Sequence, residues 1–330
     1  MTAVTAQKPM PTFRTFDDAV QLKAQFGSIP VRGDSRELEA FMTIQEAQEG
    51  RALTPDERRG REFAYLAAIM MARSGELFYW NRVTTDLIAQ TWVGFPNTWR
   101  LLPSDIPRQY GYAFLESPLV LARGDGEDIH VQVVSWVCLP KSLAGKDPGP
   151  KFPVTGPDGC QVCAFMFWPV GYTNGDYHAP MPSSVYSVNF GESIEEMMAY
   201  KSFRTSQFPL LHEAKAKVLG TMFTFMRQRL VAPSERRPSR ALRRRLGQPP
   251  EAPRTNVMIL RAYEERAAYH RDSSVTDAVD WQLQWLVRGH WRNQWYPSLK
   301  LNQPKWIMPY IKGPPDKPLV IREKAVAVTR

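Results

Sequence analysis

The amino-acid sequence predicts an α+β fold in which an N-terminal helical layer packs on a mainly antiparallel β-sheet. Capped segments with helical periodicity fill the first hundred residues, and strand-like segments joined by short turns follow from about residue 110. The chain also has 28 prolines in 330 residues, which disfavours an all-helical bundle. Short loops between successive strands favour antiparallel pairing, because parallel pairs need long crossovers.

The N-terminal helices are recognised by their capping residues and glycine stops. The clearest one follows Thr54, which stands at capping-box spacing from Glu57, with Pro55 at the first helical position and Gly75 at the end. Its apolar residues recur at helical spacing and predict one core-facing stripe. The helices expected in this part of the chain cover residues 15–27, 34–50, 54–75 and 82–91.

From about residue 110 the hydrophobic period changes to that of strands. The Gly and Asp tract "RGDGED" suits a hairpin connection between the first two strands, and "GYTNGDYHAPMP" is expected to be a loop. Ser193 and Glu196 again stand at capping-box spacing, and an apolar stripe from Leu219 to Leu230 predicts a longer helix. Strands are expected over 110–122, 129–139, 160–170, 183–190, 255–263, 280–292, 304–310 and 318–330.

The positive charge of the chain is confined to its last third. Residues 1–226 have a net charge of −3, whereas residues 227–330 have a net charge of +12. Such a local excess is typical of a surface that binds a polyanion, and it is also compatible with a solvated basic surface kept for solubility. The sequence shows no signal peptide and no apolar segment long enough to span a bilayer. We therefore expect a cytoplasmic protein without a membrane partner.

An arginine-rich segment, residues 227–254, contains nine arginines and only two acids. Its composition predicts a loop or linker, because it offers little apolar surface to offset the entropy of ordering. The part "SRALRRRL" is able to form a short helix when its charge is neutralised. The expected division is a domain over 1–226, the loop or linker over 227–254, and a C-terminal β segment over 255–330 that is either separate or part of the same domain.

Several enzyme chemistries lack residues that they need. His212 and Glu213 resemble the start of a zinc-protease motif, but Ala216 replaces the second ligand. No nucleophile elbow, phosphate loop or dinucleotide fingerprint occurs. Cys160 and Cys163 are three residues apart in a predicted strand, where they point to opposite faces, and buried free thiols explain them better than a metal site. The sequence predicts neither a cofactor nor a metal.

The segment "VRGHWRNQWY", residues 287–296, has two different faces when it is read as part of a strand over 281–292. Trp285, Val287 and Trp291 fall on an apolar face, and Arg288, His290 and Arg292 fall on a polar, basic face. Arginine offers a fork of donors that matches phosphate oxygens. A well-packed sheet with a charged outer face explains the same pattern without any ligand.

The stretch "VRGHWRNQWYPSLKLNQPKWIMPYIKGP" and the terminal "VAVTR" resemble the C-terminal ends of uncharacterised proteins found in actinobacteria and in their phages and plasmids. The resemblance covers about 45 residues and brings no activity or site residues with it. It implies a protein of a mobile element, a group that often acts in replication, transcriptional control, defence or counter-defence. This favours nucleic acid as the partner.

The leading hypothesis is a nucleic-acid-binding protein, with DNA favoured over RNA, that contacts phosphates through its basic last third. Two alternatives stay open. One is an enzyme acting on nucleic acid or nucleotides, with His290 as acid or base and Arg288 and Arg292 as anion clamps. The other is an interaction module that binds an acidic protein. The residues expected to bind nucleic acid are Arg236, Arg237, Arg240, Arg243, Arg244, Arg245, Arg288, His290 and Arg292.

Overall fold

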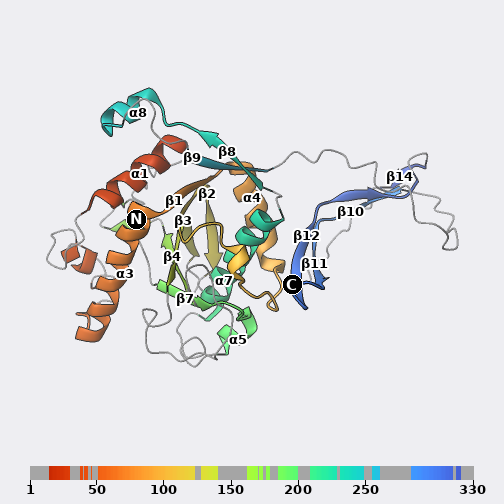
Figure 1. Cartoon of the computed structure of the whole chain (residues 1–330), viewed down its shortest axis with the longest axis horizontal. Helices are drawn as coiled ribbons and strands as arrows, with labels where there is room; N and C mark the ends of the chain where they lie inside the picture. The colour runs from red at the N-terminus through yellow and green to blue at the C-terminus, as the bar shows by residue number, and fades with distance from the viewer. Residues whose placement is uncertain are drawn as a thin grey trace, which may run out of the picture. The chain divides into compact units, whose positions relative to one another are not determined.

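The computed structural model confirms the α+β class and divides the chain into two compact units, residues 1–260 and 261–330 (Figure 1). Among the described residues, helices occur only in the first unit. The structure describes residues 15–29, 38–39, 41–43, 46, 51–122, 128–139, 162–169, 171–173, 176–178, 185–199, 209–228, 231–248, 255–260, 284–314 and 317–320.

The first unit is built on a seven-stranded sheet with the strand order β7-β4-β3-β2-β1-β9-β8. Four of the neighbouring pairs are antiparallel, as expected, but the interior strand β1 runs parallel to both β2 and β9. The strands are β1 (Glu76–Trp80), β2 (Tyr110–Ala122), β3 (Asp128–Leu139), β4 (Val162–Pro169), β7 (Val185–Asn189), β8 (Val231–Arg236) and β9 (Thr255–Leu260).

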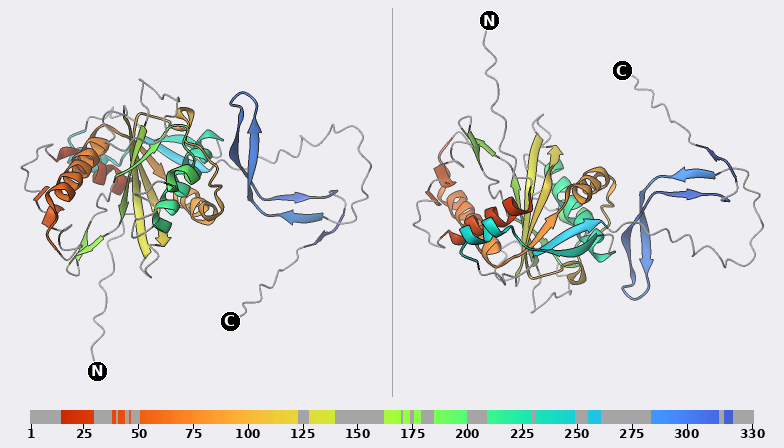
Figure 2. Two further views of the ribbon diagram at one scale, coloured as in Figure 1. Left: turned by 90° about the horizontal axis from the view of Figure 1, so that it is seen from below. Right: turned by 90° about the horizontal axis from the view of Figure 1, so that it is seen from above.

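Helices cover both faces of this sheet (Figures 1 and 2). On one face, α1 (Phe16–Ser28) and α3 (Pro55–Ser74) share a core with β1 to β4 and β9. On the other face lie α4 (Arg82–Thr91) and α7 (Pro209–Arg227), which both contact β2. Shorter elements, η1 (Trp92–Gly94), η2 (Pro103–Asp105) and α5 (Ile194–Met198), connect or flank the helices of this second face.

The expected caps form. Thr54 and Glu57 make a reciprocal capping box at the start of α3, and Ser193 and Glu196 make another at α5. Thr15 caps α1 by accepting a hydrogen bond from the Asp18 N–H at 3.1 Å. The bounds of α4 agree with the expected helix over 82–91. Most of the helix expected over 34–50 lies outside the described residues.

Aromatic side chains fill both faces of the sheet. Trp168 on β4 packs edge-on against Phe26 of α1, with ring centroids 4.7 Å apart, and against Tyr112 of β2 at 5.3 Å. On the opposite face, Trp136 of β3 packs edge-on against Phe223 of α7 at 5.4 Å. Trp136 and Trp168 are both fully buried. These contacts bury β2, β3 and β4 beneath the helices on the two faces of the sheet.

The arginine-rich segment differs from the expected loop or linker. Its described part forms the edge strand β8 and the short helix α8 (Arg240–Arg245), and both belong to the first unit. Backbone pairing with β9 holds β8, and one apolar side chain, Leu242, anchors α8 with only 3% of its surface exposed. The composition of the segment does not reveal this order, because it depends on contacts with distant elements: the β9 backbone for β8, and the core that buries Leu242 for α8.

Two smaller expectations are also revised or completed. The expected loop after β4 contains a short antiparallel hairpin, β5 (Gly171–Thr173) and β6 (Asp176–His178). Cys163 is a buried free thiol, as expected, and faces the buried free thiol of Cys138 on β3 with 3.7 Å between the sulfur atoms. Cys160 lies outside the described residues.

The second unit consists of two small sheets in its described part. The three-stranded sheet has the order β13-β10-β14, and β11 pairs with β12 in an antiparallel hairpin. The strand expected over 280–292 is interrupted at Arg288 and Gly289, because β10 and β11 pair with different strands. The strands are β10 (Gln284–Val287), β11 (His290–Tyr296), β12 (Leu301–Ile307), β13 (Tyr310–Lys312) and β14 (Leu319–Val320).

In the parts of the chain that the structure describes, no helix is both long and apolar enough to cross a membrane.

Candidate nucleic-acid interface

One face of the β11–β12 hairpin carries three basic side chains. Arg292 of β11 lies directly opposite Lys305 of β12, and His290 is two residues before Arg292 on the same strand. Directly opposite residues of an antiparallel pair share a face, and so do alternate residues along a strand. Arg292, Lys305 and His290 are all exposed. We call these three residues the cationic hairpin face.

No acidic side chain balances this charge within the hairpin or the strands on either side of it. Residues 284–314 contain five Lys or Arg residues and no Asp or Glu. None of the ion pairs between described residues involves Arg292 or Lys305. Like charges directly opposite one another destabilise a β-ladder. The hairpin therefore holds two like charges close together, and an anionic partner would reduce the repulsion between them.

His290 is open to solvent. Its Nδ1 lies 3.0 Å from the backbone carbonyl oxygen of Arg288, and the hairpin offers it no carboxylate. A general acid or base is usually held by a second polar side chain that sets its protonation state. Among the described residues of the second unit, none supplies such a partner to His290.

The opposite face of the hairpin is aromatic. Trp291 and Trp306 lie directly across from each other and pack edge-on, with ring centroids 5.1 Å apart. Such a cross-strand aromatic pair stabilises a hairpin that has few other apolar contacts. Trp295, four residues after Trp291 on the same face of β11, is 50% exposed. Exposure alternates from Trp285 to Arg292 as the sequence pattern predicts, although the apolar positions are only half-buried.

The second set of arginines surrounds α8 in the first unit. Ser239 caps this helix by accepting a hydrogen bond from the Leu242 N–H at 3.2 Å, and the Ser239 N–H donates to Asp17 Oδ1 of α1 at 3.0 Å. Arg245 donates to the side-chain oxygen of Gln21, also on α1. Leu242 completes the attachment by joining the buried core that α1 shares with the sheet. The helix is thus fixed on α1 by one apolar and two polar contacts.

The arginines of α8 divide into two groups according to their partners. Arg243 donates from Nε to the carbonyl oxygen of Pro238 at 3.3 Å, and Arg245 binds Gln21, so both help to hold the helix. Arg240 and Arg244 are exposed, lie on the same side of the helix at i and i+4 spacing, and take part in no ion pair between described residues. Arg240 and Arg244, with the exposed Arg237, are the side chains of this region best placed to meet a partner.

Arg236 differs from its neighbours because it covers an aromatic ring. Its guanidinium carbon lies 5.2 Å from the ring centroid of Phe16 in α1, a cation–π distance. The same side chain borders a cavity of about 420 Å³ with Tyr79 and Glu116. Burial and the neighbouring Glu116 carboxylate raise the pKa of Tyr79 above its ordinary value. Arg236 therefore has a structural role at the contact between β8 and α1.

The predicted site residues thus fall into one set in each unit, and Arg288 belongs to neither surface. Arg288 is exposed at the break between β10 and β11, outside the ladder that aligns Arg292 with Lys305. Lys305 was not among the residues predicted to bind nucleic acid, because only the register of the hairpin shows that it faces Arg292. Among the described residues, no group of His, Cys, Asp or Glu side chains is placed to hold a metal ion.

Comparison with known proteins identifies no family. No protein-family model matches the chain, and no curated protein matches it either. Among solved structures, the crystal structure of AcrVA2 aligns with 90% of this chain and 95% of its own, at 13% sequence identity and a TM-score of 0.39. A TM-score of this size carries no structural or functional argument.

Proposed function

We propose that this protein binds duplex DNA, with the cationic hairpin face as its principal contact. The side of α8 that carries Arg240 and Arg244 is a second contact. The observation that carries the proposal is the direct opposition of Arg292 and Lys305 in a hairpin without acidic residues. Phosphate groups would neutralise these charges and release bound counterions. The resemblance of the C-terminal sequence to proteins of phages and plasmids agrees with a role in a mobile element.

The shape of the hairpin favours duplex DNA over duplex RNA. A two-stranded β-ribbon fits the major groove of B-form DNA, which is about 12 Å wide. The major groove of A-form RNA is too narrow and deep for side chains to read. β11 and β12 pair over seven residues each and have their basic residues on one face, so one face of the ribbon is able to meet the groove or its phosphates.

The test is fluorescence anisotropy of a labelled duplex with the full chain over a range of salt concentrations. We expect the logarithm of the binding constant to fall linearly with the logarithm of the salt concentration. The double variant R292A/K305A should bind more weakly and should lower the magnitude of the slope by about 2, because each phosphate contact contributes about 1.

The matched control is R59A/R82A, which removes the same charge from two exposed arginines on α3 and α4. It should leave the salt slope unchanged. Binding that does not depend on salt, or equal losses in the two double variants, would contradict the proposed interface. Stronger binding to single-stranded or duplex RNA would contradict the choice of DNA. Capture of an acidic protein that persists after nuclease treatment would favour the interaction-module alternative.

A further inference from the structure

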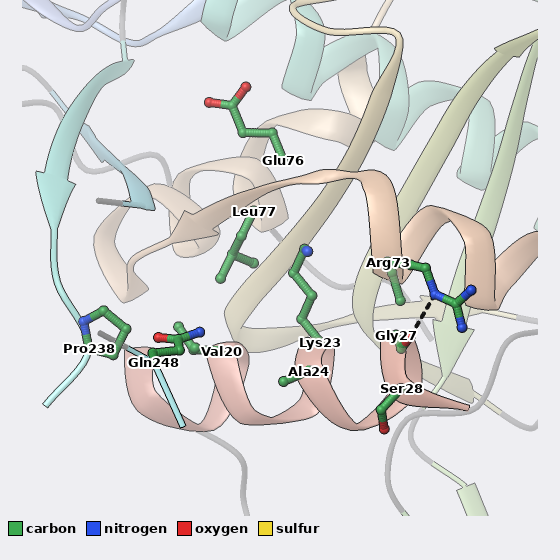
Figure 3. Close-up of a pocket in the computed structure, with 11 residues that line it drawn as sticks. Val20, Lys23, Ala24, Gly27, Ser28, Arg73, Glu76, Leu77, Pro238 and Gln248 are labelled. Atoms are coloured by element: carbon green, nitrogen blue, oxygen red, sulfur yellow. Dashed lines mark hydrogen bonds between the residues drawn. The ribbon is translucent and has the colours of Figure 1, made fainter. Parts of the chain in front are cut away.

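A second cavity of the first unit, with a volume of about 540 Å³, lies between α1, β1 and the two ends of α8 (Figure 3). Its lining comes from segments that are far apart in the sequence: Lys23 from α1, Arg73 from the end of α3, Leu77 from β1, and Pro238 and Gln248 from either side of α8. This volume falls in the range of pockets that bind small molecules.

Lys23 is the distinctive residue of this cavity. Its side chain extends from α1 toward β1, as Figure 3 shows. Burial lowers the pKa of the ammonium group below its ordinary value, and no charged neighbour offsets this effect. The Lys23 side chain makes no hydrogen bond or ion pair with another described residue. A partly buried cation without a counter-charge is costly unless something pairs with it.

The two other charged residues of the cavity are already engaged. Arg73 donates from Nε to the Gly27 carbonyl oxygen and from Nη2 to the Ile29 carbonyl oxygen, both at 2.8 Å, and so caps the C-terminal end of α1. Glu76 accepts a hydrogen bond from Nε of Arg108 at 2.6 Å. Of the three charged groups, Lys23 is therefore the one whose side chain has no partner among the described residues.

The remaining wall is mostly apolar and has one amide at its edge. Val20, Ala24, Leu77 and Pro238 supply aliphatic surface. Gln248 is placed by the turn that ends α8, in which Gly247 has a φ of 64° and the Gln248 N–H donates to the Arg243 carbonyl oxygen at 2.9 Å. Its carboxamide adds a hydrogen-bond donor to the lining, beside Val20 and Pro238 (Figure 3).

We propose that this cavity binds a small organic monocarboxylate, with the carboxylate on Lys23 and the apolar part of the ligand against Val20, Ala24 and Leu77. One available cation matches one negative charge. A phosphate or a polyanion would need several donors, and the only guanidinium in the cavity is engaged with backbone carbonyls. This site is separate from the proposed DNA contacts, and its test does not depend on them.

The experiment is isothermal titration calorimetry of the full chain with hexanoate, using hexanamide as an uncharged ligand of the same length. We expect saturable binding of one hexanoate, and binding of hexanamide that is weaker by about tenfold or more. The affinity for hexanoate should fall as the pH rises through the lowered pKa of Lys23, because the neutral amine no longer attracts a carboxylate.

Two variants test separately the charge of Lys23 and the volume of the cavity. Lys23→Met removes the cation but keeps an unbranched side chain, and should reduce hexanoate binding by about tenfold or more without lowering thermal stability. Ala24→Leu fills part of the cavity and should weaken both ligands. Lys300→Met removes an exposed lysine of the second unit as the matched control and should change neither affinity. Equal binding of the two ligands, unchanged binding by the Lys23 variant, or no saturable binding of hexanoate up to about 10 mM would overturn the proposal.

Discussion

Asp105 and Arg227 form a buried ion pair that joins η2 to the last residue of α7. Asp105 Oδ1 lies 3.2 Å from Nη1 of Arg227, and Asp105 Oδ2 accepts a hydrogen bond from the Leu102 N–H at 3.0 Å. Only 3% of Asp105 is exposed. Burial raises the pKa of Asp105 to about 6, even though Arg227 and the backbone hydrogen bond both act to lower it.

This raised pKa predicts a pH dependence of stability. As the pH rises above the ordinary value of 3.8, the unfolded chain loses the Asp105 proton first, whereas the folded chain keeps it until about pH 6. The free energy of unfolding should therefore fall between about pH 4 and pH 6, by on the order of 3 kcal/mol for this group. Urea unfolding of wild type and Asp105→Asn across this range isolates the effect. The variant should gain stability relative to wild type as the pH rises, and a constant difference would contradict the assignment.

Gly111 of β2 predicts a packing effect. It lies directly opposite Trp136 of β3, and a Cβ atom at this position would overlap the six-membered ring of the indole. Gly111→Ala should destabilise the first unit by about 1–3 kcal/mol, measured by urea unfolding. Trp136→Phe makes room for the added methyl group. The double variant should therefore lose less free energy of unfolding than the sum of the losses of the two single variants. Additive costs would show that the overlap is relieved in another way.

The two roles assigned to residues of α8 are separable. Leu242→Ala removes a buried side chain that attaches α8 to α1, and should increase amide hydrogen exchange along α8 at a cost of about 2–4 kcal/mol. The double variant R240A/R244A removes exposed charge only, and should weaken DNA binding without changing hydrogen exchange in α8. A double variant that loosens α8 would show that these arginines hold the helix.

Trp295 tests which face of the hairpin meets the DNA. It lies on the face opposite Arg292 and is 50% exposed. If the cationic hairpin face makes the contact, Trp295→Ala should leave duplex affinity unchanged. Stacking of an aromatic side chain on a base contributes about 1–3 kcal/mol, so a tenfold or greater loss of affinity would show that the aromatic face makes the contact.

Elements with a local signal were well predicted from the sequence. The helix α4 has its expected bounds, and β2 covers the expected residues 110–122. Their caps, turns and alternating patterns depend on residues that are neighbours in the sequence. The interior strand β1 was not expected, because "ELFYW" is buried on both faces and shows no alternation. It also follows the helix α3 with only Gly75 between them.

The candidate sites were predictable only in part. The basic character of residues 288–292 is visible in the sequence, but the pairing of Arg292 with Lys305 depends on the register of the hairpin. Lys23 looks like an ordinary polar residue of an amphipathic helix, and its isolation depends on contacts that Arg73 and Glu76 make elsewhere. Such sites arise from distances between elements, on which local periodicity gives no information.

The position of β1 between β2 and β9 has a consequence for folding. Phe78 pairs with Asn256, roughly 180 positions later in the chain, so the sheet closes only after most of the first unit has been synthesised. Until then, the edge of β1 that β9 will cover offers free backbone donors and acceptors to other strands. A nascent chain that stalls before residue 255 therefore carries an open strand edge and is exposed to aggregation.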